Sequence, residues 1–308
     1  MRSKVLAYAV ALQLIPNFFA ITPQTTTIMS VGTLAAQSTE AVPDNGLVNP
    51  TAKQRVFSAS NEAGTREALP SGPTRDPSAI AILRQILLAT TGQQPQKIPT
   101  FSAEGTITYF KAKDKVDAPM MIKARGLFDF TLVAKLPEGE RRLVLNRNAG
   151  EYTETDGKRR SIPFLSAINS AIPVVPQLWF WVAIADEQVS VIDQGEKTLN
   201  GRQVRVVRVQ PKVFESDDVA IGALVHKDFY VDVENLQIRQ IVDNWHPDES
   251  ALQSVEQIVE FSDYSSMAGI IAPARVLLKM RGNPVAELRI TKLSLNQLID
   301  DSNFQIEK

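Results

Sequence analysis

The chain has 308 residues, of which 44% are hydrophobic and 22% are charged, as in an ordinary globular protein of one or two domains. The formal net charge is −1 and no basic stripe is present, so the sequence gives no support for nucleic-acid binding. Cysteine is absent, which excludes disulfides, thiolate metal sites, thiol nucleophiles and a lipid-modified N-terminal cysteine. No cofactor is expected.

The N-terminus has the pattern of an export signal. Two positive charges precede the apolar run Val5–Ile15, and small residues follow at Ala35 and Ala36. We therefore predict a signal peptide over residues 1–36 and a periplasmic or otherwise exported protein. Residues 37–75 are rich in Ser, Thr, Pro, Gly and Asn, which predicts a disordered linker.

A helix is predicted from Asp76 onward. Asp76 is expected to cap its first turn, and Pro77 suits the first helical position. Gly92 is expected to end it. Its apolar residues recur at helical spacing, so one face must pack on something apolar.

After Pro99 the apolar residues alternate with polar ones, which predicts β-strands joined by short turns. The expected strands are 102–110, 120–124, 126–135, 141–147, 151–155, 189–193, 203–210, 226–233, 237–244, 255–264, 274–281 and 286–295. Strands that are neighbours in sequence usually pair, so they predict a large antiparallel sheet. A sheet of this size tends to curl.

One segment interrupts the strands. Residues 162–185 contain no charged side chain. This uncharged segment is long enough in principle for a membrane-spanning helix. Pro163, Pro173 and Pro176 argue against such a helix, because an interior proline breaks the hydrogen-bond ladder. We predict two short apolar helical pieces, which are either plain core or a lid that faces a ligand.

From residue 76 onward, a few segments follow one another in a recognisable order. They are the helix Asp76–Thr91, the strand with Gly105, the turn Leu199–Arg202, the hairpin 226–244 with Asp232 and Arg239, and the run Val255–Phe304 with Gly269, Pro273, Gly282, Asn283 and Asp301. This order of elements resembles the LolA/LolB-like lipoprotein-carrier superfamily.

The resemblance implies a domain over residues 76–308 of the α+β class, mainly β. It would be a large curved antiparallel sheet, an unclosed half-barrel, with helices covering its concave face.

The resemblance also implies a non-enzymatic carrier that holds the acyl chains of a lipid or lipoprotein in an apolar cavity, with a role in outer-membrane biogenesis. The expected partners are a lipid or acylated lipoprotein and, transiently, a membrane or envelope proteins; no nucleic acid is expected, and the protein is expected to be a monomer. The alternative is an envelope sensor that uses the same fold to bind a protein.

Alternation and amphipathicity predict which side chains face the lipid. The candidates are Ile82, Leu83, Ile86, Leu87, Phe128, Phe130, Leu132, Phe164, Leu165, Ile168, Leu178, Trp179, Trp181, Val276, Leu278 and Met280. Burial stabilises such a side chain by about 1.5–3 kcal/mol whether it meets protein or ligand, so core and pocket remain open alternatives.

Catalytic and metal sites have little support. No nucleophile elbow or phosphate-binding loop occurs. The acidic run 243–249 with His246 could bind a divalent cation, but we interpret it as a solvated turn, and His226 as a surface or hydrogen-bonded histidine. Residues 158–160, Lys-Arg-Arg, could meet an anionic headgroup, although we favour a solvated turn.

Overall fold

A computed structural model describes residues 73–92, 99–111, 114–147, 149–211, 224–246 and 254–306. The predicted signal peptide, all but the last residues of the predicted linker, and residues 247–249 of the acidic run lie outside these ranges.

The described residues form one antiparallel sheet of 13 strands in the order β6-β5-β4-β3-β2-β1-β13-β12-β11-β10-β9-β8-β7. The strands are β1 Thr100–Lys111, β2 Asp114–Arg125, β3 Asp129–Leu136, β4 Gly139–Leu145, β5 Gly150–Thr153, β6 Arg159–Ile162, β7 Ser190–Leu199, β8 Arg202–Gln210, β9 Lys227–Asp232, β10 Ile238–Trp245, β11 Val255–Met267, β12 Ile270–Met280 and β13 Asn283–Leu295. The predicted mainly-β, unclosed half-barrel class is confirmed.

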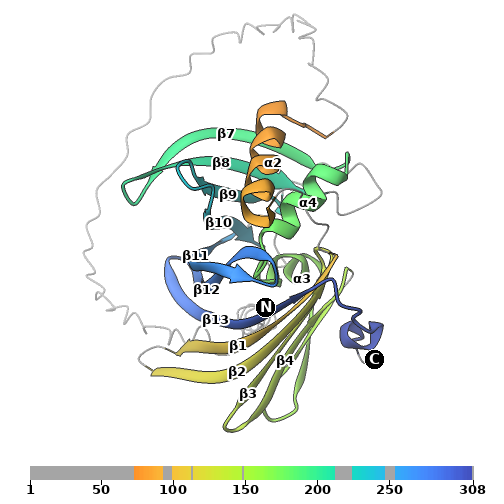
Figure 1. Cartoon of the computed structure of the whole chain (residues 1–308). Coiled ribbons are helices and arrows are strands. Elements are labelled where there is room, and N and C mark those ends of the chain that lie inside the picture. Colours follow the sequence, from red (N-terminus) through yellow and green to blue (C-terminus); the bar gives the residue numbers. More distant parts are fainter. Residues whose placement is uncertain are drawn as a thin grey trace, which may run out of the picture. The chain divides into compact units, whose positions relative to one another are not determined.

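The sheet consists of two meanders that meet at a central seam (Figure 1). The first runs outward from β1 to β6, and the second returns from β7 to β13, which pairs with β1. The two free edges, β6 and β7, are therefore consecutive in sequence. The chain that joins them is the uncharged segment 162–185, so its two helices cross the open side of the sheet.

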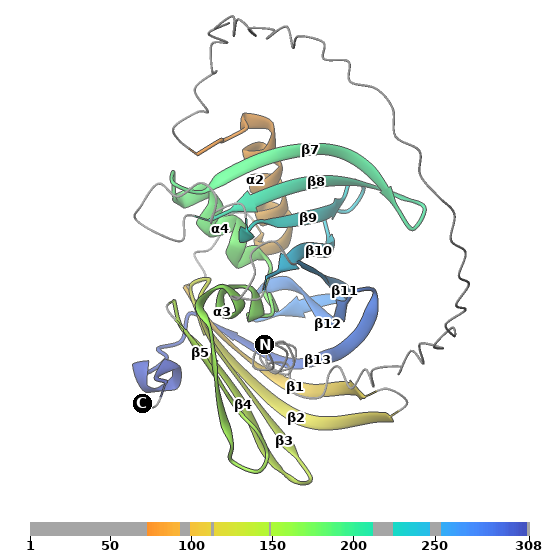
Figure 2. The same ribbon diagram turned by 180° about the vertical axis from the view of Figure 1, so that it is seen from behind.

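That segment forms α3 Phe164–Ser170 and α4 Gln177–Ala185. The break between them contains Pro173 and Pro176, as the sequence predicts. Helix α3 packs against both β4 and β10, although six strands separate these two in the sheet order. The sheet must therefore curl around α3 (Figure 2).

The predicted N-terminal helix is α2, Pro77–Thr91, which packs against α4, β7 and β12. Asp76 precedes it but makes no side-chain cap. Its carboxylate instead accepts a hydrogen bond from the backbone N–H of Asp193 at 2.8 Å, which ties the start of the helix to the edge strand β7. The prediction that Asp76 caps the first turn is thus wrong, because its carboxylate forms a hydrogen bond with a backbone N–H group of β7 instead. Among the described residues no helix has the length and hydropathy of a membrane span.

Two other sequence predictions differ from the structure. Residues 126–128 form a turn, so β3 begins only at Asp129 and Phe128 does not share its face. Arg159 and Arg160, predicted to lie in a solvated turn, begin the short edge strand β6. Lys158 remains in the preceding turn, paired with Asp156.

Candidate lipid-facing surface

The inward side of the first three strands is a continuous apolar surface. Its members alternate along each strand and pair across the sheet, as Ile107 does with Ala118, and Ile122 with Leu132. All of them are buried. We call this surface the β1–β3 face; it consists of Phe101, Ala103, Ile107, Tyr109, Ala118, Met120, Ile122, Ala124, Phe130, Leu132, Ala134 and Leu136.

The helices pack chiefly on the other half of the sheet. Helices α2 and α4 lie over the strands from β7 to β12, while β1–β3 extend away from them (Figures 1 and 2). In the covered half, Phe180 packs on Phe229 with ring centroids 4.7 Å apart, and Trp179 lies 6.2 Å from the same ring. The apolar surface therefore continues beyond the part that the helices cover.

The structure divides the predicted lipid-facing residues between these two halves. Phe130 and Leu132 lie on the β1–β3 face, and Phe128 lies in the β2–β3 turn, with the Arg147 guanidinium 5.6 Å from its ring. The candidates on the helices and on β12 belong to the covered half. Of these, Leu83, Ile86, Leu87, Ile168, Leu178, Trp179, Val276 and Met280 are buried, while Ile82, Phe164, Trp181 and Leu278 are partly buried. The side chain of Leu165 is outside the described part of the chain.

Sequence reasoning missed a charged group on the inward side of β4. Arg141 alternates with Leu143 and Leu145 and pairs with Ala134 of the β1–β3 face. Its side chain is only 5% exposed. An arginine in phase with inward leucines was the available signal.

Aromatic rings and one carboxylate surround this guanidinium. It lies 4.9 Å from the ring of Tyr109 and 5.9 Å from the ring of Tyr152. Glu154 lies 3.6 Å from Arg141 and 3.7 Å from Arg160. We call these five residues the arginine–tyrosine cluster.

Both phenols of the cluster keep their protons at neutral pH. Burial raises the pKa of Tyr109 to about 12, against the opposing effect of the neighbouring Arg141 guanidinium. Burial raises the pKa of Tyr152 further still. Each phenol therefore keeps the O–H group with which a tyrosine donates a hydrogen bond.

A second buried polar group lies beneath α3 and α4. Lys227 and Asp243 form an ion pair in which each side chain is 1% exposed, and the Lys227 ammonium lies 5.3 Å from the Trp179 ring. Asp243 is thus not part of a solvated turn, because it faces inward from β10 toward Lys227 on β9. His246 is also buried. The described residues contain no group of acidic and histidine side chains able to hold a metal ion.

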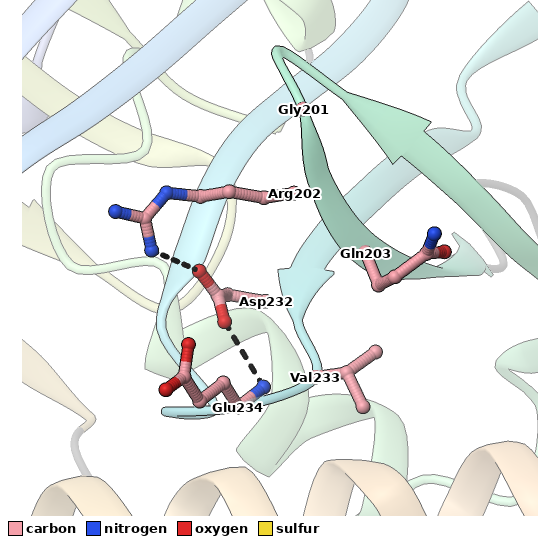
Figure 3. A pocket seen from close by; sticks show the side chains of 6 residues that line it. All are labelled: Gly201, Arg202, Gln203, Asp232, Val233 and Glu234. Carbon is pink, nitrogen blue, oxygen red and sulfur yellow. Dashed lines mark hydrogen bonds and ion pairs between the residues drawn. The ribbon is translucent and has the colours of Figure 1, made fainter.

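Two surface pockets in the described part of the chain are lined mainly by charged and polar residues. One of about 550 Å³ lies between the β7–β8 and β9–β10 turns and is lined by Gly201, Arg202, Gln203, Asp232, Val233 and Glu234 (Figure 3). In it the Asp232 carboxylate accepts hydrogen bonds from Arg202 at 3.3 Å and from the backbone N–H of Glu234 at 3.0 Å. A second, of about 230 Å³, adjoins it and includes Arg202, Arg239 and Arg275. Charged linings of this kind do not suit an acyl chain.

Asp232 is the centre of that polar region. Burial acts to raise the pKa of its carboxyl, but hydrogen bonds from Arg239 and from the backbone N–H groups of Glu234 and Asn235 outweigh burial, and the pKa is lowered. The carboxylate therefore stays ionised and fixes the β9–β10 turn.

No family model and no curated protein matches this chain. Solved structures that resemble it include a DUF1329 family protein from Desulfovibrio piger, which is 10% identical, with 74% of this chain and 96% of that chain covered at a TM-score of 0.47. A LolA superfamily protein from Nitrosomonas europaea is 12% identical, with 74% and 97% covered at a TM-score of 0.46. A putative outer membrane lipoprotein-sorting protein domain from Vibrio parahaemolyticus is 10% identical, with 73% and 95% covered at 0.45.

The chain is similar to LolA superfamily structures.

Proposed function

We propose that this chain is an exported, non-enzymatic carrier that holds the acyl chains of a lipid or lipoprotein against the β1–β3 face. The supporting observation is the extension of one apolar inward surface beyond the strands on which α2 and α4 pack. An acyl chain gains about 0.8 kcal/mol for each CH₂ group that it buries, and this surface offers apolar contacts over three adjacent strands.

Uptake requires a conformational change, because the side chains of the β1–β3 face are buried in the structure. We expect this face to become accessible, an acyl chain to enter, and contact with a membrane or acceptor to release it. No energy source is implied by the residues, so the direction of transfer depends on the relative affinities of donor, carrier and acceptor.

The first test is to purify the protein without detergent and analyse its organic extract by mass spectrometry. The proposal expects a stoichiometric phospholipid, fatty acid or acylated peptide, or uptake of a fluorescent fatty acid by the lipid-free protein. A well-folded protein that contains no lipid and takes up none would overturn it. A stoichiometric protein partner in place of lipid would support the envelope sensor instead.

Two adjacent methionines provide a matched pair of variants. Met120 lies on the β1–β3 face and is 5% exposed, whereas Met121 points to the opposite side of β2 and is 42% exposed. Met120→Gln places an amide among apolar contacts and is expected to weaken fatty-acid uptake by about tenfold. Met121→Gln is expected to leave uptake unchanged, with circular dichroism confirming that both variants fold.

A further inference from the structure

Arg141 is a charged residue on the inward surface, and apolar packing does not explain why its side chain is buried there. It extends from β4 beside Ala134, at the border of the β1–β3 face, and its side chain is almost fully buried. A guanidinium keeps its charge at all accessible pH values. Burying it is costly unless its charge and its N–H groups find partners.

The partners that the structure provides are incomplete. The contact of Arg141 with Glu154, at 3.6 Å, is longer than a hydrogen bond, and Glu154 also faces Arg160. Glu154 is therefore shared between two guanidinium groups. The Nε of Arg141 and the hydroxyl of Tyr152 are both buried, and neither has a hydrogen-bond partner.

The rings of Tyr109 and Tyr152 hold the guanidinium in place by cation–π contact. This leaves a fixed, positively charged donor group and an unpartnered phenol next to an apolar surface. Oxygen atoms of a carboxylate or phosphate satisfy such a group, since an arginine can donate two parallel hydrogen bonds to either.

We propose that the arginine–tyrosine cluster binds the anionic headgroup of an amphiphile whose acyl chain lies on the β1–β3 face. Arg141 donates to the carboxylate or phosphate oxygens, and the Tyr152 hydroxyl donates a further hydrogen bond. The inference rests on the proposed lipid-binding function and adds to it a preference for acidic over neutral lipids.

Competition among three ligands with the same alkyl chain tests the preference. Hexadecanoate, hexadecyl phosphate and hexadecanol each displace a neutral fluorescent probe from the folded protein, and their affinities are compared. A charge-assisted hydrogen bond in a buried site corresponds to roughly tenfold to hundredfold in affinity. At least one of the two acids is therefore expected to bind that much more tightly than the alcohol, and the better acid identifies the headgroup.

Substitutions in the arginine–tyrosine cluster show which residues cause the preference for acids over the alcohol. Arg141→Gln is expected to remove the difference in affinity between acid and alcohol, and Tyr152→Phe is expected to reduce that difference. Arg142→Gln is the matched control: its residue is adjacent on β4, its side chain points to the opposite face, and the wild-type preference is expected to persist.

The outcomes separate the two proposals. Equal affinities for acids and alcohol in the wild-type protein would overturn the headgroup site but leave the carrier intact. A preference that survives in folded Arg141→Gln would also overturn the site. Failure of all three ligands to displace the probe or bind would overturn both the carrier and the headgroup site. The wild-type comparison decides the matter even where Arg141→Gln does not fold.

Discussion

Lys227 and Asp243 show what one ion pair contributes to the stability of the fold when water is excluded from it. Both side chains are almost fully buried, and Gln257 lies 3.5 Å from the same Asp243 oxygen that Lys227 contacts. The other carboxylate oxygen of Asp243 has no hydrogen-bond partner. Removing one member of such a pair leaves an unpaired charge in a site of low dielectric.

Lys227→Met is therefore expected to lower the free energy of unfolding by about 3–5 kcal/mol, as measured by urea denaturation. Adding Asp243→Leu to this variant is expected to restore part of the loss, because it removes the unpaired carboxylate. Lys158→Met is the control: Lys158 pairs with Asp156 on the surface, where an ion pair contributes about 0–1 kcal/mol. An equal, small effect for Lys227→Met and Lys158→Met would contradict this view of the buried pair.

The sequence around Asp243 could not reveal this pairing. Asp243 begins a run of polar and acidic residues that is typical of a solvated turn. Its partner lies on the neighbouring strand β9, and a register shift lies between Ile238 and Gln240 in the pairing of β10 with β9. The alternation of apolar and polar residues predicts the strands. It does not predict which inward-facing polar side chains contact each other across the sheet. The same limit applies to Arg141, whose two tyrosines come from β1 and β5.

At the scale of elements, Arg75 connects three parts of the fold. Its guanidinium donates hydrogen bonds to the backbone oxygens of Ala183 at 3.0 Å and of Asp186 and Val189 at 2.8 Å. Two of these residues lie at the C-terminal end of α4, where carbonyl groups lack helical partners and attract a cation. Arg75 also forms a parallel bridge with Val191 of β7.

Arg75→Ala is expected to free the end of α4 and the start of α2 together. We expect faster amide hydrogen exchange over 183–193 and a loss of stability of about 1–3 kcal/mol, since several charge-assisted hydrogen bonds disappear. Arg84→Ala is the control, because Arg84 is exposed on α2 and its loss is expected to change stability by less than about 0.5 kcal/mol. Unchanged exchange near α4 in Arg75→Ala would show that this arginine does not hold the helix.

Element types were largely predictable, for reasons visible in particular residues. Period-two alternation gives the strands, and Pro173 and Pro176 separate α3 from α4. Strand β6 escaped prediction because it has four residues, Arg-Arg-Ser-Ile, of which only Ile162 is apolar. Arg75 falls in a segment whose composition predicts a linker, and only the contact with β7 and α4 gives it a structural role.

At the scale of the whole sheet, the seam between β1 and β13 joins the two meanders. Phe101 pairs with Leu295, so contacts here link residues that are far apart in sequence. Local pattern predicts neighbouring hairpins but not that the first strand of the domain pairs with the last. The seam also has an irregularity between Glu104 and Gly105 that alternation does not reveal.

Gly105 lies at the irregularity of the seam, where the backbone of Arg289 on β13 faces it. A Cβ atom built there would be 1.9 Å from the backbone oxygen of Arg289 and 2.9 Å from its carbonyl carbon, and neither neighbour is a flexible side chain. Gly105→Ala must therefore displace β13 from β1. We expect a loss of about 1–3 kcal/mol or more in the free energy of unfolding.

Two probes show whether the seam couples the two meanders. The three tryptophans, Trp179, Trp181 and Trp245, lie in α4 and β10, so their fluorescence reports on the second half, while amide exchange in β2–β4 reports on the first. In the wild-type protein both probes are expected to give one urea transition.

In Gly105→Ala the two transitions are expected to separate, because the pairing that joins the halves is displaced. Thr106→Ala, one residue further along the same strand, adds no atoms at the seam and is expected to keep them coincident. Coincident transitions at unchanged stability in Gly105→Ala would mean that the seam accommodates a methyl group and that other contacts, such as those of α3 with β4 and β10, hold the two halves together.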